Sequence, residues 1–291
     1  MSIPIPVNEP ILEFSAGSPE KHSLKEKLAE LSGKEIEIPL IINGEEVKTG
    51  NIGTCVMPHD HGHVLAHFHQ AGEPEVQQAI ESSLNAWKSW SKTHLQERAD
   101  VLLKAADLLA GPWRNTLNAA TMLNMSKNAY QAEIDAACEL IDFWRFNPYF
   151  AQEIHNQNPM YSPDGTRNSS EHRPLEGFVF AVTPFNFISI GGNLPTAPAL
   201  MGNVALWKPA SSAVYPAYFV MEILKEAGLP NGVINFIPGS GAVVGPLVMN
   251  HPNFTGVHFT GSTPVFQGMW KTIGENISNY KSYPRIVGET G

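Results

Sequence analysis

The sequence is poor in cysteine and in positive charge. Only Cys55 and Cys138 occur in 291 residues, and they are far apart, without the spacing of a metal-binding or redox motif. This excludes a disulfide framework and predicts a reducing compartment, in which each thiol is a small buried hydrophobic group. The 19 Lys and Arg residues against 28 Asp and Glu leave a net charge of −9, which disfavours nucleic acid and anionic membranes as partners.

Long apolar runs and targeting segments are also missing. The longest apolar stretches, such as Phe178 to Val182, are far shorter than the roughly 20 residues that span a membrane. Met1 to Glu20 contains neither the basic nor the apolar region of a secretory leader and has no arginine. We therefore expect no membrane span and no leader peptide.

The start of the chain predicts a surface arm, a helix and a hairpin. Residues 1–34 combine a proline-rich arm, expected to lie on the surface or on a neighbouring subunit, with a short helix between Ser18 and Gly33. Ile36 to Val47 alternates around Asn43-Gly44, a strong signal for a β-hairpin.

Helices and a polar excursion fill the rest of the first half. Apolar residues at helical spacing predict helices at Glu73 to Trp90, Leu95 to Leu109, Trp113 to Met125 and Tyr130 to Phe146. Residues 156–173 then turn polar and rich in proline, serine and asparagine. That composition predicts a protruding hairpin or excursion between two larger blocks.

The helix predicted over Tyr130 to Phe146 alternates apolar and acidic residues. Its acids are Glu133, Asp135, Glu139 and Asp142. We expect them to form a solvated face, as such runs usually do. As an alternative, Glu139 or Glu133 could lie beside a substrate pocket and bind a cationic group.

Five histidines follow one another at short intervals: His59, His61, His63, His67 and His69. Alternate residues of a strand share a face, and imidazole is a common metal ligand, so the pattern is a candidate metal site. Beyond Asp60, however, no carboxylate or thiol cluster accompanies them. We therefore predict no metal site and read the stretch as a histidine-rich loop and edge strand.

The second half, residues 174–291, alternates short strands with helices. Strands are predicted at Phe178 to Val182, Val204 to Trp207, Val233 to Ile237, Gly256 to Phe259 and Arg285 to Val287. Helices are predicted between them at Gly192 to Met201, Tyr215 to Ala227, Val243 to Met249 and Pro264 to Ile277. This order is typical of an α/β fold with a Rossmann-like parallel sheet covered on both faces.

Polar residues follow several of these strands, where open α/β folds bind ligands. Asn186 could donate its amide to an oxygen that becomes negative, or form a simple turn. Lys208 follows a buried strand, and Pro209 fixes its exit, so its ammonium could reach a ribose or phosphate; the alternative is an ordinary surface lysine.

Two further motifs fit a dinucleotide site. Pro238 to Gly245 contains GxGxxxG, one residue longer than the dinucleotide fingerprint, so it is a weak signal. Phe259 to Pro264 runs from a strand through Thr-Gly-Ser into a helix, with Ser262 placed as N-cap. The N-terminus of that helix could bind pyrophosphate through backbone N–H groups.

The order and spacing of these motifs resemble the NAD(P)-dependent aldehyde dehydrogenase superfamily. The shared series is TPFN after a strand, then KP, GLPxGVxN, FTGS and a strand ending in GET. Within it the chain most closely resembles the Δ1-pyrroline-5-carboxylate dehydrogenases. The stretches that carry this resemblance are Asn8 to Pro10, Gly17 to Glu20, Gln131 to Phe143, Arg173 to Phe178 and Leu206 to Pro209.

The resemblance implies a role for each site residue. Asn186 is expected to form half of an oxyanion hole, and Glu289 to be the general base that activates the deacylating water. Lys208 is expected to bind the adenosine ribose of NAD. The remaining cofactor contacts implied are Thr183, Gly261, Ser262, Thr263, Pro264 and Val265. In the family a cysteine thiolate attacks the aldehyde, the adduct gives a hydride to NAD+, and water hydrolyses the thioester.

The sequence departs from the family in two places. Many relatives have a Glu three residues after the lysine that excludes a 2′-phosphate, whereas this chain has Ser211, so NAD rather than NADP is implied by the subfamily alone. The family's nucleophilic cysteine lies a few dozen residues beyond the general base, and neither Cys55 nor Cys138 occupies that position. The expectation is an N-terminal part of the enzyme, with the catalytic domain absent and no turnover of its own.

The resemblance also implies an organisation and a function. Residues 1–34 would be the arm and short helix, 35–155 the first part of the cofactor domain, 156–173 an oligomerisation excursion and 174–291 the truncated dinucleotide-binding part. The complete enzyme would oxidise L-glutamate γ-semialdehyde to L-glutamate in proline catabolism. It would be a homodimer or higher homo-oligomer in the cytoplasm, or alternatively in the mitochondrial matrix.

The sequence alone leaves three other interpretations open. The chain could be a product that binds dinucleotide or assembles with full-length subunits without turnover. It could belong to an aldehyde dehydrogenase for another small aldehyde. A structural protein with a decayed site is the least favoured, because Asn186, Lys208, Ser262 and Glu289 are all present.

Overall fold

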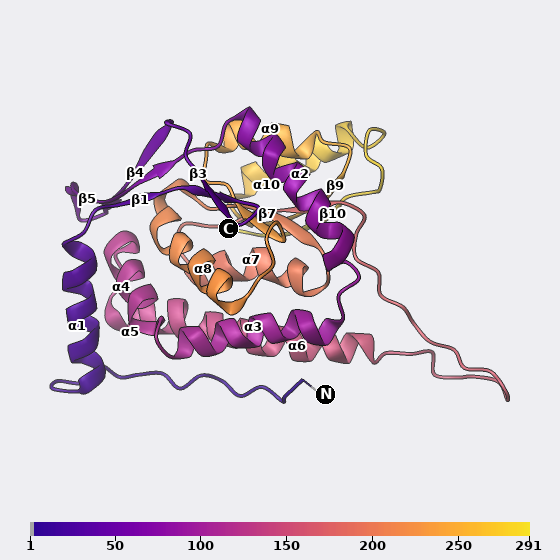
Figure 1. The fold of residues 1–291 in the computed structure, drawn as a ribbon, viewed down its shortest axis with the longest axis horizontal. Coiled ribbons are helices and arrows are strands. Elements are labelled where there is room, and N and C mark those ends of the chain that lie inside the picture. Colours follow the sequence, from indigo (N-terminus) through magenta and orange to yellow (C-terminus); the bar gives the residue numbers. More distant parts are fainter. Residues whose placement is uncertain (1–2) are drawn as a thin grey trace.

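A seven-stranded sheet forms the centre of the computed structural model, which describes residues 3–291 (Figure 1). Its strand order is β10-β9-β6-β7-β8-β2-β3. The five consecutive parallel strands are β6 (Phe178–Val182), β7 (Val204–Lys208), β8 (Ile234–Phe236), β9 (Phe254–Gly261) and β10 (Arg285–Thr290). The prediction of a Rossmann-like parallel sheet is confirmed.

Helices cover both faces of this sheet, as its apolar strands require. One face carries α7 (Ile188–Leu200) and α8 (Val214–Ala227), with α3 (Leu95–Ala110), α4 (Arg114–Met125) and α6 (Leu140–His155) outside them (Figure 1). The other carries α2 (Glu73–Trp90), α9 (Gly241–Met249) and α10 (Thr263–Glu275). The strands between them are apolar, and β7 and β8 are buried along their whole length. Gly228 ends α8 in the left-handed conformation at φ 95°, which a glycine adopts without strain.

The predicted hairpin at Ile36 to Val47 is only partly right. β2 (Leu40–Ile42) and β3 (Glu45–Val47) do form an antiparallel hairpin around Asn43-Gly44 at the edge of the main sheet. The buried Asn235 of β8 holds its turn, because its Oδ1 accepts from the Asn43 N–H at 2.8 Å. β1 (Ile36–Ile38) instead leaves for a second sheet.

That second sheet has three strands in the order β1-β5-β4. The histidine-rich strand β5 (Asp60–His69) lies between β1 and β4 (Ile52–Met57), so the prediction of an edge strand is wrong. Parallel pairing with β1 comes from a segment more than 20 residues earlier, which periodicity within the stretch cannot reveal. His63 bonds the carbonyl of Ser32 at 2.8 Å, and His69 bonds Glu37 at 2.9 Å.

The excursion at residues 156–173 projects from the body as two extended limbs (Figure 1). A turn at its far end is closed by Thr166 N–H donating to the Pro163 carbonyl at 3.0 Å. All of these residues are described, and no strand forms among them. Met160 and Tyr161 are fully or largely exposed near the tip.

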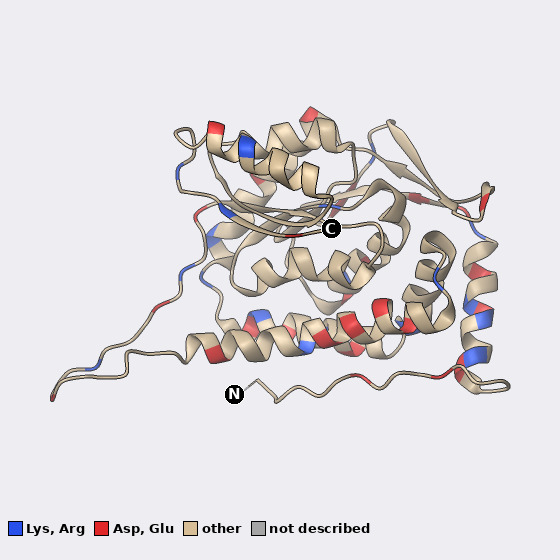
Figure 2. Ribbon diagram, turned by 180° about the vertical axis from the view of Figure 1, so that it is seen from behind, with Lys and Arg blue, Asp and Glu red and all other residues tan. Residues whose placement is uncertain are grey.

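The proline-rich arm lies on the helices of its own chain. Residues 3–15 run along α6 (Figure 1), and Ile3 and Phe14 are buried near the two ends of the arm. Asp142 of α6 accepts from the side chain of Asn8 at 2.6 Å and from the backbone N–H of Glu9 at 2.8 Å. Lys and Arg residues are scattered over many elements of the fold (Figure 2).

The acidic residues of the Tyr130 to Phe146 region do not form a solvated face, so that prediction is wrong. The chain forms a short helix α5 (Ala129–Ala132), a π-helical segment from Glu133 to Glu139, and then α6. Glu133 is fully buried and Asp135 is 1% exposed. Charged partners that lie elsewhere in the chain explain this burial.

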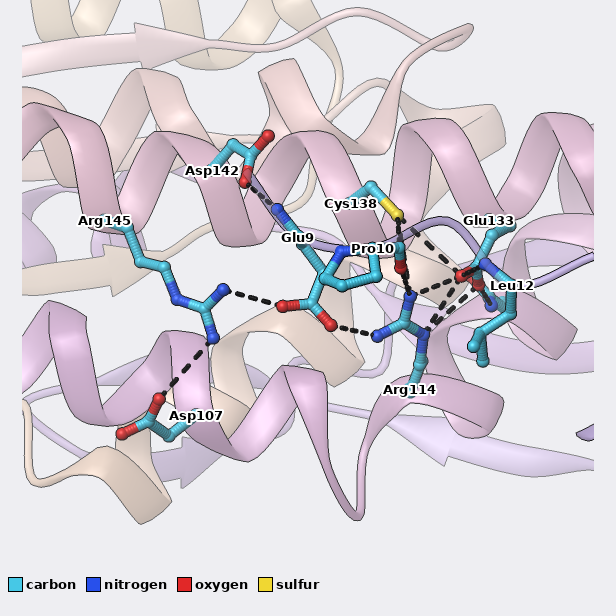
Figure 3. Close-up of polar contacts among 10 residues, drawn as sticks. Glu9, Pro10, Leu12, Asp107, Arg114, Glu133, Cys138, Asp142 and Arg145 are labelled. Carbon is cyan, nitrogen blue, oxygen red and sulfur yellow. Dashed lines mark hydrogen bonds and ion pairs between the residues drawn. The ribbon is translucent and has the colours of Figure 1, made fainter. Parts of the chain in front are cut away.

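The buried Glu133 belongs to an ionic network that fastens the arm (Figure 3). Arg114 pairs with both Glu133 and Glu9, and its guanidinium also donates to the Pro10 carbonyl at 2.7 Å. Arg145 binds the other oxygen of Glu9 at 2.6 Å. Removal of one partner would leave an uncompensated charge in the interior.

We predict that Arg114→Met lowers the free energy of unfolding by about 3–5 kcal/mol, because it leaves Glu133 buried without its cation. Arg173→Met is the control, since Arg173 is 77% exposed and its pair with Glu176 spans 3.9 Å. We expect the control to change stability by less than about 1 kcal/mol. Urea unfolding of the two variants measures both values, and equal small losses would contradict the role of the network.

Candidate active site

The carboxyl ends of four parallel strands meet at one edge of the main sheet. The ladder sets Val182 of β6 opposite Lys208 of β7 on one side and Phe259 of β9 on the other. On the next strand, Glu289 of β10 is opposite Thr260 of β9. The residues predicted for the site therefore lie on adjacent strands.

A cleft of about 620 Å³ opens at this edge. Seven of the predicted site residues line it: Thr183, Asn186, Lys208, Gly261, Ser262, Val265 and Glu289. Thr263 and Pro264, predicted with them, begin α10 between Ser262 and Val265. Nucleotide-sized ligands occupy clefts of this size.

Lys208 is held inside the protein rather than at its surface. It is 8% exposed, so the alternative of an ordinary surface lysine is wrong. Burial lowers the pKa of its ammonium group to about 8. Its Nζ donates to the Pro209 carbonyl at 3.1 Å. Because an ammonium carries three N–H donors, it retains donors for a ligand in the cleft.

Thr183 connects the end of β6 to the core. Its Oγ1 accepts from the indole N–H of Trp207 at 3.0 Å, and its backbone N–H donates to the Lys208 carbonyl at 3.2 Å. Trp207 is fully buried on β7. This anchoring fixes the point where the chain leaves the sheet for the Asn186 turn.

Asn186 lies in the turn between β6 and α7 and is exposed at the cleft. Its neighbours Phe185 and Phe187 are 65% and 41% exposed. The turn ends at Phe187, the N-cap of α7, whose side chain cannot accept a hydrogen bond. Because Asn186 is exposed at the cleft, its carboxamide is available to a bound molecule.

Glu289 reaches two cavities. Besides the cleft, it lines a neighbouring cavity of about 400 Å³ that also contains Glu139. Glu139 accepts a hydrogen bond from the Ser189 hydroxyl of α7 at 2.7 Å. Thr260 Oγ1 lies 3.5 Å from Glu289 Oε2. Glu139 and Glu289 therefore line the same smaller cavity, together with Ile190 and Asn193 of α7.

The first turn of α10 presents an anion-binding position to the cleft. Ser262 is its N-cap, as predicted, although its side chain makes no capping hydrogen bond. The early N–H groups of a helix have no intrahelical acceptor and carry partial positive charge. The glycine-rich run does not line the cleft; a Cβ on Gly239 would lie 3.3 Å from the backbone of Ala71, so this glycine permits close packing.

Both cysteines are buried away from the cleft. Cys55 lies on β4 and is 1% exposed, and burial raises the pKa of its thiol to about 12. Cys138 lies in the π-helical segment, where burial and the nearby Glu133 raise the pKa of its thiol to about 12. Neither sulfur is a thiolate at neutral pH.

None of the helices in residues 3–291 is long and apolar enough to cross a membrane. Nor does this part of the chain contain a group of three His, Cys, Asp or Glu residues placed to bind a metal ion.

Two residues next to the site were not predicted. Asp135 binds the start of α7 and Lys127 binds Asp135, so both contact the Asn186 turn through its neighbours. The sequence carried no signal for either residue, because this helix was predicted to begin at Gly192, whereas α7 begins at Ile188 with Phe187 as its N-cap.

Comparisons with known proteins agree with this geometry. Residues 47–284 match the model of the aldehyde dehydrogenase family. A curated relative from Agaricus bisporus, a Δ1-pyrroline-5-carboxylate dehydrogenase, is 51% identical over 99% of this chain and 53% of its own length. The mitochondrial human Δ1-pyrroline-5-carboxylate dehydrogenase is 46% identical over 98% of this chain and 50% of its length. The chain therefore spans about half the length of these relatives.

Solved structures give the same result. The Mycobacterium tuberculosis Δ-pyrroline-5-carboxylate dehydrogenase bound with NAD superimposes with a TM-score of 0.98 at 48% identity, over 100% of this chain and 54% of its own. A 1-pyrroline-5-carboxylate dehydrogenase from Thermus with bound NAD gives 0.92 at 30% identity, over 100% of this chain and 56% of its own. The parallel sheet brings the family's motif residues together at one cleft, and the family model matches most of the length of this chain. This chain therefore belongs to the aldehyde dehydrogenase family.

Proposed function

We propose that the chain is the cofactor-binding part of an NAD-dependent dehydrogenase that oxidises L-glutamate γ-semialdehyde to L-glutamate in proline catabolism. The observation that carries this proposal is the cleft at the carboxyl edge of the sheet, where Asn186, Lys208 and Glu289 lie together. The names of the relatives support the substrate, and the NAD-bound neighbours support the cofactor.

The residues of the cleft fit a dinucleotide. Lys208 offers donors to a ribose hydroxyl from the end of β7, and the first turn of α10 at Ser262 and Val265 offers N–H groups to a pyrophosphate. NAD, when bound, supplies the acceptor for a hydride. Ser211, at the position where many relatives have Glu, is exposed.

The reacting end of the substrate would lie in the part of the cleft lined by Asn186 and Glu289. Asn186 would donate its amide to the aldehyde oxygen as that oxygen becomes negative. Glu289 would take a proton from the water that releases the product. Glu139, which lines the same cavity as Glu289, would bind the ammonium group of glutamate semialdehyde.

The assembly and compartment follow from the same resemblance. The exposed side chains of Met160 and Tyr161 on the excursion suit contact with a second copy, so we propose a homodimer or a higher homo-oligomer for the complete enzyme. We propose the cytoplasm as its compartment. The mitochondrial names of the human and Dictyostelium discoideum relatives support the mitochondrial matrix as the alternative.

We predict that NAD+ binding weakens at high pH because Lys208 loses its proton. The pKa of about 8 means that the ammonium is mostly charged at pH 7 and mostly neutral at pH 9. If only the charged form donates to the ribose, the dissociation constant rises about tenfold between these pH values. Isothermal titration of the chain with NAD+ at several pH values measures this rise.

The variant Lys208→Met separates this effect from other titrations. We expect it to bind NAD+ at least about tenfold more weakly at pH 7, since a charge-assisted hydrogen bond is lost, and to show no rise in dissociation constant through pH 8. Lys225→Met is the matched control, because Lys225 is a half-buried lysine of α8 that pairs with Glu222 at 3.0 Å and does not line the cleft. A wild-type chain that binds no NAD+ at any pH would contradict the proposed function itself.

We also predict that the 291-residue chain alone does not oxidise glutamate semialdehyde. Covalent aldehyde oxidation needs a thiolate near Asn186, and both cysteines of this chain are buried thiols elsewhere. Incubation with NAD+ and glutamate semialdehyde should produce no NADH. Turnover that disappears in Glu289→Gln would refute this prediction, whereas traces that persist in that variant would point to a contaminant.

A further inference from the structure

We propose that Asp135 and Lys127 are positioning residues that hold the Asn186 turn in its reactive arrangement. This inference rests on the proposed role of Asn186 in the oxyanion hole. It concerns residues that lie outside the cleft and touch neither the proposed cofactor nor the proposed substrate.

The start of α7 needs a capping group that its own sequence does not supply. The N-cap is Phe187, and the first two backbone N–H groups of the helix belong to Ile188 and Ser189. Asp135 accepts from both: Oδ2 from Ile188 N at 3.2 Å and Oδ1 from Ser189 N at 2.9 Å. One carboxylate from another helix therefore caps α7 with both of its oxygens.

Lys127 extends this cap to the aromatic ring of the turn. Its Nζ lies 2.6 Å from Asp135 Oδ2 and 3.9 Å from the centroid of the Phe187 ring. The side chains of Lys127 and Asp135 are only 14% and 1% exposed. The charge pair, with this little solvent around it, is stronger than a surface pair, and the cation–π contact adds to it.

The contacts of Asp135 and Lys127 restrict the end of the turn that enters α7, whereas Thr183 restricts the end that leaves β6. Thr183 fixes the chain where it leaves β6, through Trp207. Asp135 and Lys127 fix it where it enters α7, at Phe187 and Ile188. Asn186 directly precedes Phe187, so the backbone direction of Asn186 depends on how Asp135 and Lys127 hold Phe187 and Ile188. An oxyanion donor must be in place before the charge develops, which gives this rigidity a function.

The test is the mobility of the turn in Asp135→Asn, measured by NMR on the uniformly ¹⁵N-labelled chain. An amide has one acceptor oxygen instead of two, and it does not attract Lys127 by charge. We expect the steady-state ¹H–¹⁵N NOE of the Asn186 and Phe187 amides to fall, and exchange of the Ile188 and Ser189 amides to quicken at least about tenfold.

Asp142→Asn is the matched control. Asp142 lies on α6, about two helical turns beyond Asp135, and also accepts from a backbone N–H, but this N–H belongs to Glu9 of the arm. A purely structural loss lowers the denaturation midpoint in both variants. Only a positioning role changes the Asn186 and Phe187 amides in Asp135→Asn and leaves them unchanged in Asp142→Asn.

Variants of Lys127 provide a second, independent test, which remains possible even if Asp135→Asn does not fold. Lys127→Arg keeps the charge and the stacking contact and should retain the wild-type NOE values. Lys127→Met keeps the stem but loses both contacts and should lower them. Unchanged amides in both Asp135→Asn and Lys127→Met would overturn the inference. The NMR test needs no cofactor, so failure to bind NAD+ would count against the proposed function alone.

Discussion

Strand β6 pairs in parallel with β7 on one side and with β9 on the other. The candidate site depends on this parallel pairing. Parallel strands must return through a helix, so every carboxyl end points to the same edge. Lys208 and Glu289, 81 positions apart by their numbers, therefore reach one cleft from different strands. The helices that make the return also cover the sheet, which keeps Lys208 out of water and its pKa low.

Buried carboxylates organise the helices behind that sheet. Glu133 and Asp135 are two residues apart on one π-helical segment, yet they bind different cations on different sides. Glu133 binds Arg114 and with it the N-terminal arm, whereas Asp135 binds Lys127 and the start of α7. A widened helical turn of this kind often occurs near functional sites. Here it connects the outer helical layer to the turn that carries Asn186.

The sequence predicted those features that a local pattern determines. The alternation of strands and helices predicted the parallel sheet, and its strand ends pointed to Asn186 and Lys208. Glu289 was identified by the family resemblance that the order of motifs carries. The sequence could not reveal the burial of Glu133 and Asp135, because burial of an acid depends on partners such as Arg114 that no periodicity brings together. The prediction that β5 is an edge strand was wrong for the same reason, since the neighbouring strand β1 comes from another segment of the chain. The roles of the site residues and the division of the chain into domains stay predictions.

The contact between the hairpin turn and β8 has a consequence for how the chain acquires its structure during synthesis. Asn43 and Asn235 are 192 residues apart in sequence, and Asn235 is fully buried when they meet. At a synthesis rate of about 5–20 residues per second, the ribosome needs about 10–40 s to make the partner that β2 requires. Throughout that interval the apolar Leu40–Ile42 strand lacks its place in the sheet. Until then β2 has only its hairpin partner β3 beside it, so the apolar residues of this strand complete their burial late in synthesis.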